Sequence, residues 1–110
     1  MTLAEFQKLI ADLYLDRDRD RGVDGCFRWL TEEVGELARA LRRREAVRSA
    51  PSDAHDVASA EANLREELAD VLAWLSTIAS LTGVDLEHAA TAEYGHGCPN
   101  CAASPCACPR

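Results

Sequence analysis

The sequence predicts an all-α protein, for two reasons. Apolar residues recur at intervals of three and four through about the first 94 of the 110 residues, which is the period of an amphipathic helix. No segment alternates apolar and polar residues as a strand would. Because aromatic residues make up only 5% of the chain, the core must be built from Leu, Ala, Val and Ile. We expect three main helices and a short fourth.

The first two helices are marked by their ends. Thr2 and Glu5 have the spacing of a capping box and predict a helix start. We expect that helix to fade through the alternating Asp/Arg run and to stop at Gly22. A second helix follows from Asp24, a suitable N-cap, and its apolar stripe is Leu30, Val34, Leu37 and Leu41. It ends in the arginine-rich segment 42–48, where cations suit the helix C-terminus.

The third and fourth helices lie on either side of one glycine. Pro51 breaks the chain before the third helix, and Gly83 is a natural residue to follow its end. The apolar stripe of this helix is Leu64, Leu68, Val71, Leu75 and Ile78. Asp85 then caps a short last helix. Beyond it, Gly, Pro and Cys replace the helix formers. The chain therefore divides into a helical domain, 1–94, and a Cys-rich tail, 95–110.

Charge and composition narrow the class of protein. Lys and Arg number 12 against 19 Asp and Glu, a net charge of −7, which disfavours a nucleic-acid partner. The N-terminal residues lack the basic and apolar regions of a signal peptide. The longest apolar stretch, 71–84, is too short to span a bilayer. We expect a cytoplasmic protein with no membrane contact.

The second and third helices repeat one acidic pattern. Segments 30–37 and 64–71 each place two carboxylates, three residues apart, at the edge of the apolar stripe. The four residues are Glu33, Glu36, Glu67 and Asp70. Unpaired carboxylates that converge at a helix interface cost several kcal/mol, which divalent cations would offset. Oxygen ligands alone favour Mg²⁺ or Mn²⁺. The alternative is a set of rim carboxylates paired with neighbouring Arg residues or solvent.

These motifs resemble those of a known family. Glu32-Glu33-x-x-Glu36 followed by Glu67-x-x-Asp70, with Trp29-Leu30-Thr31 before the first motif and 71–75 after the second, resembles the EExxE…ExxD signature of MazG-like all-α nucleoside triphosphate pyrophosphohydrolases. The resemblance covers about residues 3–94. It implies Mg²⁺-dependent cleavage of a nucleoside triphosphate to the monophosphate and pyrophosphate. It also implies a homodimer or homotetramer in which two chains complete a four-helix bundle.

One departure concerns the connection between the two motifs. Thirty residues, 37–66, separate Glu36 from Glu67, which is long for this family. The extra length predicts either extended helices or an additional loop. Three short helices would also make a thin core for a monomer, which agrees with the implied dimer.

Residues near the motif have two interpretations each. Glu32 is either a general base for the attacking water or a solvated residue. Arg39 and Arg43 could meet phosphate oxygens, or pair with neighbouring carboxylates at the end of their helix. Trp29 and Trp74 could stack on a nucleobase or belong to the core. The base and sugar are not readable from the sequence.

The tail carries the second motif. Cys98-x-x-Cys101 and Cys106-x-Cys108 supply four thiolates within eleven residues, which suits a structural Zn²⁺. The alternative is a reduced, unstructured tail or adventitious disulfides. His96 could replace one cysteine as a ligand.

Three functions remain open at this point. The first is a pyrophosphohydrolase for common nucleoside triphosphates. The second is an enzyme of the same fold acting on a phosphoribosyl or modified nucleotide. The third is a non-catalytic helical module that senses nucleotide or docks a partner through a zinc tail. It also stays open which phosphorus atom is attacked and whether the assembly is a dimer or a tetramer.

Overall fold

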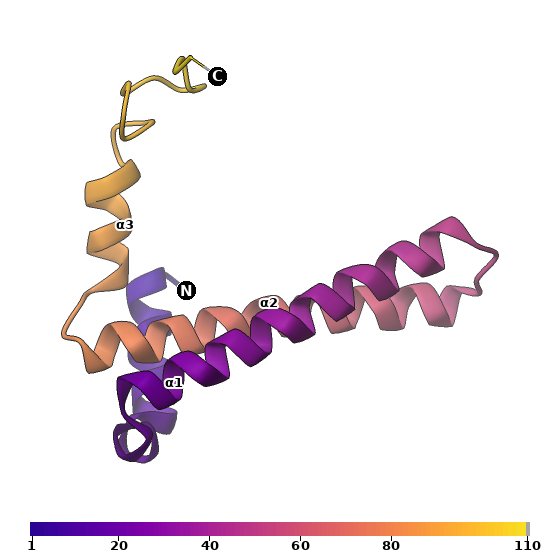
Figure 1. Ribbon diagram of the computed structural model, residues 1–110, viewed down its shortest axis with the longest axis horizontal. Coiled ribbons are helices and arrows are strands. Elements are labelled where there is room, and N and C mark those ends of the chain that lie inside the picture. The colour runs from indigo at the N-terminus through magenta and orange to yellow at the C-terminus, as the bar shows by residue number, and fades with distance from the viewer. Residues whose placement is uncertain (110) are drawn as a thin grey trace.

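A computed structural model describes residues 1–109 as three helices, with no strand in that range. Helix α1 spans Leu3–Ser49, α2 spans Ala54–Leu81 and α3 spans Leu86–Tyr94. The second part of α1 runs antiparallel to α2 as a long hairpin, and α3 leaves the hairpin at a steep angle (Figure 1). The predicted all-α class is confirmed.

Helix α1 is bent sharply at Gly22. This residue has φ 72° and ψ 174°, outside the helical region, so the chain before and after it forms two helical segments. The predicted stop at Gly22 is therefore confirmed as a kink. The Asp/Arg run does not fade but stays helical up to the bend, supported by ion pairs three residues apart. Residues 3–21 fold back against the C-terminal half of α2.

The helix ends follow the expected capping chemistry. The Thr2 hydroxyl accepts from the Glu5 amide at 3.1 Å, and the Glu5 carboxylate accepts from the Thr2 amide at 3.2 Å, which completes the predicted capping box. The Asp85 carboxylate accepts from the His88 amide at 2.9 Å, as predicted for the last helix. Gly83, with φ 73°, follows the C-cap of α2.

The long connection between the motifs is extended helix. Helix α1 continues to Ser49 and α2 begins at Ala54, so only residues 50–53 form a loop. Two hydrogen bonds join the helices near this end. Arg43 Nη2 donates to Ser59 Oγ at 2.7 Å, and Arg44 Nε donates to Glu61 Oε1 at 2.7 Å.

The core is thin, and some residues predicted to pack between the helices are exposed instead. The buried apolar residues are few and mostly small: Ile10, Cys26, Ala40, Ala60 and Ala79. Four residues expected on the packing stripes are 40–51% exposed: Val34, Leu41, Leu68 and Leu75. The hairpin packs instead through positions one residue earlier in each helix, such as Glu33, Ala40 and Glu67. The radius of gyration, 17.4 Å, exceeds the roughly 13 Å of a compact domain this size.

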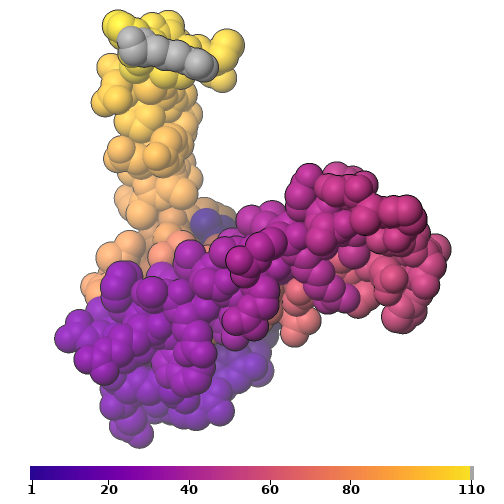
Figure 2. All heavy atoms as spheres, turned by 45° about the vertical axis from the view of Figure 1, so that its right-hand side comes forward, coloured from indigo at the N-terminus to yellow at the C-terminus, as the bar shows by residue number. Residues whose placement is uncertain are grey.

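Gln7 fastens the first segment to the corner between α2 and α3. Its amide nitrogen donates to the Val84 carbonyl at 2.8 Å, and its amide oxygen accepts from the Leu86 amide at 2.9 Å. Helix α3 and the tail beyond Tyr94 project from the hairpin as one arm, with the tail at its end (Figure 2). Within residues 1–109 no single helix is long and apolar enough to cross a membrane, and α2 and α3 meet that test only as a pair bent by 99°.

Candidate metal centre and pocket

Three of the four predicted carboxylates converge between the helices of the hairpin. One oxygen from each of Glu33, Glu67 and Asp70 lies within 4.8 Å of the other two. Glu33 comes from α1, and the other two come from successive turns of the same face of α2. The antiparallel packing therefore brings the two sequence motifs to the same level of the hairpin.

The cluster lacks the hydrogen bonds that buried carboxylates need. Glu67 is only 8% exposed, and the Oε2 atoms of Glu33 and Glu67 are buried without a hydrogen-bond partner. Burial and the neighbouring carboxyl of Glu33, with the charges of Glu36 and Asp70, raise the pKa of Glu67 to about 7. Orphaned oxygens and mutual repulsion fit a hard divalent cation held among these residues.

The other two acidic residues of the first motif lie differently. Glu36 is half-buried and close enough for its charge to act on Glu67. Glu32 is exposed. The structure thus groups Glu33, Glu67 and Asp70 most tightly, with Glu36 beside them and Glu32 on the solvent side.

A pocket of about 230 Å³ opens beside the carboxylates. Its walls come from both ends of the sequence, because the segment before Gly22 folds against α2. The lining residues are Ile10, Tyr14, Arg17, Asp18, Glu33, Asp70, Ala73, Trp74 and Thr77. The pocket therefore combines carboxylate oxygens, one arginine and aromatic walls.

The sequence allowed an arginine of the Asp/Arg run 16–21 to lie over the site but favoured a solvated helix end, and it singled out neither Arg17 nor Asp18. Asp18 is only 2% exposed, and its Oδ1 lies 3.3 Å from Arg21 Nε in an ion pair not aligned as a hydrogen bond. A signal was present, because Asp18 continues the helical stripe through Ile10 and Tyr14. The alternating charges around Asp18 favoured the opposite interpretation, because such charged runs usually lie in solvent.

The two tryptophans stack on each other. The rings of Trp29 and Trp74 are 5.8 Å apart between centroids and 8° from parallel. The guanidinium of Arg21 lies 5.3 Å from the Trp29 ring and 5.9 Å from the Trp74 ring. Trp74 also lines the pocket.

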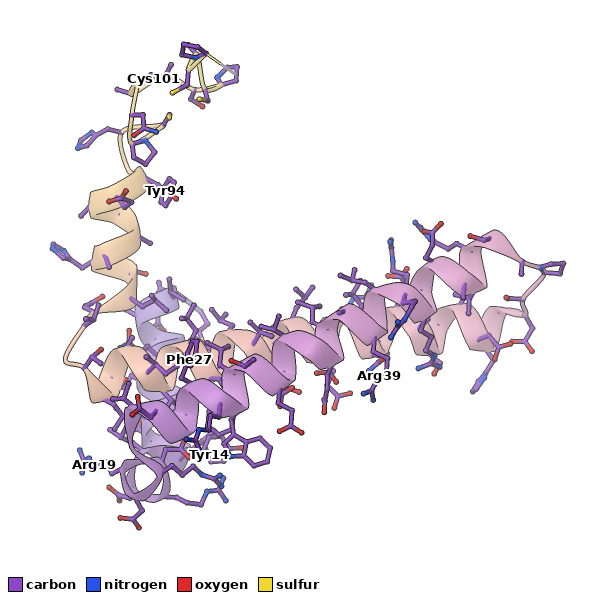
Figure 3. All side chains as sticks on the ribbon, viewed as in Figure 1. Tyr14, Arg19, Phe27, Arg39, Tyr94 and Cys101 are labelled. Atoms are coloured by element: carbon purple, nitrogen blue, oxygen red, sulfur yellow. The ribbon has the colours of Figure 1, made fainter. Side chains whose placement is uncertain are left out.

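Arg39 and Arg43, for which both phosphate contact and pairing with carboxylates were open, do not line this pocket. Arg39 is exposed, midway along the hairpin and away from the bend where Tyr14 and Arg19 lie (Figure 3). Arg43 donates its hydrogen bond to Ser59. Another candidate metal group lies in the tail, where Cys98, Cys101, Cys106 and Cys108 offer sulfur atoms within 4.8 Å of one another.

Comparison with known proteins identifies the family. The model of the MazG nucleotide pyrophosphohydrolase domain matches residues 22–100, well over half of the chain. The chain belongs to this family. It is 35% identical over 89 residues to the uncharacterised protein YvdC of Bacillus subtilis (strain 168), an alignment covering 79% of this chain and 84% of the relative. No solved structure matches the chain significantly.

The MazG match contains both acidic motifs. It begins at Gly22, where α1 bends, and ends at Asn100, between the first two tail cysteines. Arg17 and Asp18 therefore come from a segment before the matched region, although they line the same pocket as Glu33 and Asp70.

Proposed function

We propose that this MazG-family chain hydrolyses nucleoside triphosphates of the cytoplasm to nucleoside monophosphate and pyrophosphate, with one water consumed per turnover. The observation that carries the proposal is the cluster of Glu33, Glu67 and Asp70, which is buried, short of hydrogen bonds and open to a pocket lined by Arg17. Membership of a nucleotide pyrophosphohydrolase family supports the same reaction class.

The cation we propose is Mg²⁺, or Mn²⁺ in its place. Glu33, Glu36, Glu67 and Asp70 would hold it, since their oxygens are the ligands these ions prefer. When bound, Mg²⁺ supplies charge neutralisation at the phosphate oxygens. The carboxylates would hold the ion at one place beside the pocket that Glu33 and Asp70 line.

The remaining pocket residues supply binding and orientation. Arg17, which lines the pocket, would donate hydrogen bonds to phosphate oxygens. Trp74 offers an aromatic wall to a nucleobase, and Trp29 backs it through the ring stack. Glu32, exposed beside the cluster, is the candidate base that takes a proton from the attacking water.

We propose further that two copies of the chain pair, as a homodimer or as half of a homotetramer. One side of the hairpin carries apolar residues spaced by seven on each helix: Phe27, Val34 and Leu41 on α1, and Leu68 and Leu75 on α2. Each of these five residues comes directly after a residue that faces the other helix. Because the two helices are antiparallel, side chains displaced in this way from the contact line lie on the same side of the hairpin. We call this set the apolar face. Covering it would complete a four-helix bundle.

Pyrophosphate release from a panel of ribo- and deoxyribonucleoside triphosphates tests the reaction. We expect release from at least one substrate with Mg²⁺ and none with a chelator. Glu33→Gln and Asp70→Asn should each lower the rate by at least about 100-fold, because each removes a cation ligand. Glu66→Gln is the matched control, since Glu66 is an exposed glutamate next to Glu67.

The panel also separates the alternatives. Release of orthophosphate instead of pyrophosphate would contradict the proposed bond cleavage. A phosphoribosyl-nucleotide is added to the panel to test the second candidate substrate class. If the chain binds nucleotide saturably with Mg²⁺ but turns over no member of the panel, a sensing module would be favoured.

A further inference from the structure

We propose that the tail is a zinc-binding element in which Cys98, Cys101, Cys106 and Cys108 hold one structural Zn²⁺. The family match ends at Asn100, so it covers one of these four ligands, and the carboxylate chemistry of the pocket does not involve them. The site is therefore separate from the proposed hydrolase reaction.

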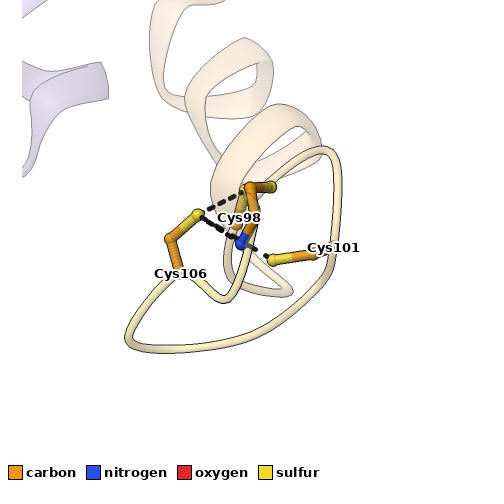
Figure 4. A group of neighbouring side chains, drawn as sticks. Cys98, Cys101 and Cys106 are labelled. Carbon is orange, nitrogen blue, oxygen red and sulfur yellow. Dashed lines mark hydrogen bonds between the residues drawn. The ribbon is translucent and has the colours of Figure 1, made fainter. Parts of the chain in front are cut away.

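The spacing of the sulfur atoms fits one tetrahedral ion. The Sγ–Sγ distances are 3.7 Å for Cys98–Cys108, 3.5 Å for Cys98–Cys106 and 3.9 Å for Cys101–Cys106. A zinc–sulfur bond of about 2.3 Å in a regular tetrahedron implies sulfur atoms about 3.8 Å apart. Figure 4 shows the sulfurs of Cys98, Cys101 and Cys106 turned toward one another.

The same arrangement is unlike a pair of disulfides. All four tail cysteines are free, and both Cys98 and Cys106 have two sulfur neighbours rather than one. Shared neighbours are what a common central ion requires, whereas disulfides join sulfurs in exclusive pairs.

The backbone around the sulfurs is shaped to support thiolates. The Ala107 amide donates to Cys101 Sγ at 3.3 Å, and the Cys108 amide donates to Cys106 Sγ at 3.4 Å. Backbone N–H groups therefore point at two of the four sulfurs, as suits thiolate ligands.

Gly97 is needed for the turn that carries the first cysteine pair. Its φ is 105°, and a Cβ there would lie 2.9 Å from the Ala102 carbonyl oxygen. The turn is closed by hydrogen bonds from the Cys98 amide to the Ala103 carbonyl and from the Ala102 amide to the Cys98 carbonyl.

Apart from these turn hydrogen bonds, the tail has little to stabilise its fold. None of residues 95–109 is buried, so this segment has no apolar core of its own. A structural metal is the usual substitute in so short an element. Four thiolates select Zn²⁺ over the Mg²⁺ proposed for the carboxylates, and they leave no open position for a substrate.

Metal content of the full-length chain tests the proposal. After purification from zinc-replete cells, elemental analysis should find about one zinc per chain, and replacement by Co²⁺ should give the visible spectrum of tetrahedral thiolate coordination. The double variant Cys98→Ser/Cys101→Ser should retain less than about a tenth of the zinc, with helix content by circular dichroism unchanged. Cys26→Ala is the control and should retain full zinc, because Cys26 is buried in the helical body.

A second variant tests the turn. Gly97→Ala should weaken zinc retention against a competing chelator by at least about tenfold while keeping all four ligands. Three results would overturn the proposal. The first is a wild-type chain that contains no metal and whose tail thiols can all be alkylated. The second is iron bound in place of zinc, and the third is an unchanged zinc content in the double variant. None of these readouts depends on nucleotide hydrolysis, so failure of the tail site and failure of the proposed function are distinguishable.

Discussion

The carboxyl group of Glu67 makes the stability of the metal-free chain depend on pH. Its pKa is raised from 4.5 to about 7, so the folded state binds this proton more tightly than the unfolded chain does. The stabilisation is complete below about pH 4.5 and is lost as pH rises through 7. We therefore expect the melting temperature without metal to fall between pH 5 and pH 8, measured by calorimetry.

The Glu67→Gln variant separates the proton from the cation. At pH 8 without metal it should melt higher than wild type, because it removes a charge from a crowded cluster. Mg²⁺ should raise the melting temperature of wild type at pH 8 and leave that of the variant nearly unchanged. An equal Mg²⁺ effect on both proteins would contradict a site that includes Glu67.

Arg21 is the countercharge of a buried carboxylate. It lies 3.3 Å from the Asp18 carboxylate, which is 2% exposed, and over the stacked Trp29 and Trp74 rings. Arg21→Ala should destabilise the chain by about 1–3 kcal/mol, since it leaves a buried charge unpaired. Chemical denaturation followed by tryptophan fluorescence measures this change.

Arg19→Ala is the matched control for that substitution. Arg19 is exposed and pairs only with the fully exposed Asp16, at 3.5 Å. Its loss should change stability by less than about 0.5 kcal/mol. Equal effects of the two substitutions would show that the Asp18–Arg21 pair does not support the pocket.

The bend in α1 is the element that builds the pocket. Gly22 has a positive φ with ψ near 180°, a conformation almost restricted to glycine, and no neighbouring atom would obstruct a Cβ. Gly22→Ala should therefore cost about 1–3 kcal/mol through backbone strain alone. It should also lower nucleotide affinity, because the bend directs Arg17 and Asp18 to the pocket.

Gly35 offers the opposite result in the same helix. It lies in regular helix, is exposed and has open space around it. Gly35→Ala should stabilise the chain by about 0.5–1 kcal/mol, as expected for an exposed helical glycine. Thermal denaturation of both variants checks the contrast, and destabilisation of similar size in both would contradict the bend as the cause.

The ends of the elements were predictable because capping is local chemistry. Thr2 with Glu5, Gly83 and Asp85 each act within a few residues of their own position. The buried side of each helix was less predictable, because the packing partner decides it. Leu68 and Leu75 are more apolar than Glu67, yet Glu67 faces α1 and the two leucines face solvent.

The same distinction applies to the candidate site. Glu33, Glu67 and Asp70 were predictable as a group, since two copies of one spacing on antiparallel helices meet at one level. Arg17 and Asp18 were not, because only the bend at Gly22 brings a distant charged segment to the pocket. The tail cysteines were predictable from spacing alone, since all four lie within eleven residues.

On the whole molecule, the apolar face leaves five large apolar side chains 40–59% exposed. The proposed dimer through the apolar face makes a direct prediction about mass in solution. Val34→Lys with Leu68→Lys should shift the assembly toward monomer, measured by sedimentation equilibrium, because a charge there would be buried. Ser52→Lys, in the loop at the far end of the hairpin, adds charge off this face and should leave the mass unchanged.

We propose that the buried carboxylates of α1 and α2 make this chain a metal-dependent pyrophosphohydrolase. The most direct test compares the rate of pyrophosphate release, at saturating Mg²⁺ and with the best substrate of the panel, among wild type, Glu67→Gln and Glu66→Gln. We predict that Glu67→Gln lowers the rate by at least about 100-fold and that Glu66→Gln keeps the wild-type rate. The two variants each remove one carboxylate, and the two positions are adjacent in the sequence. Wild-type rates in Glu67→Gln, or equal losses in both, would contradict the claim.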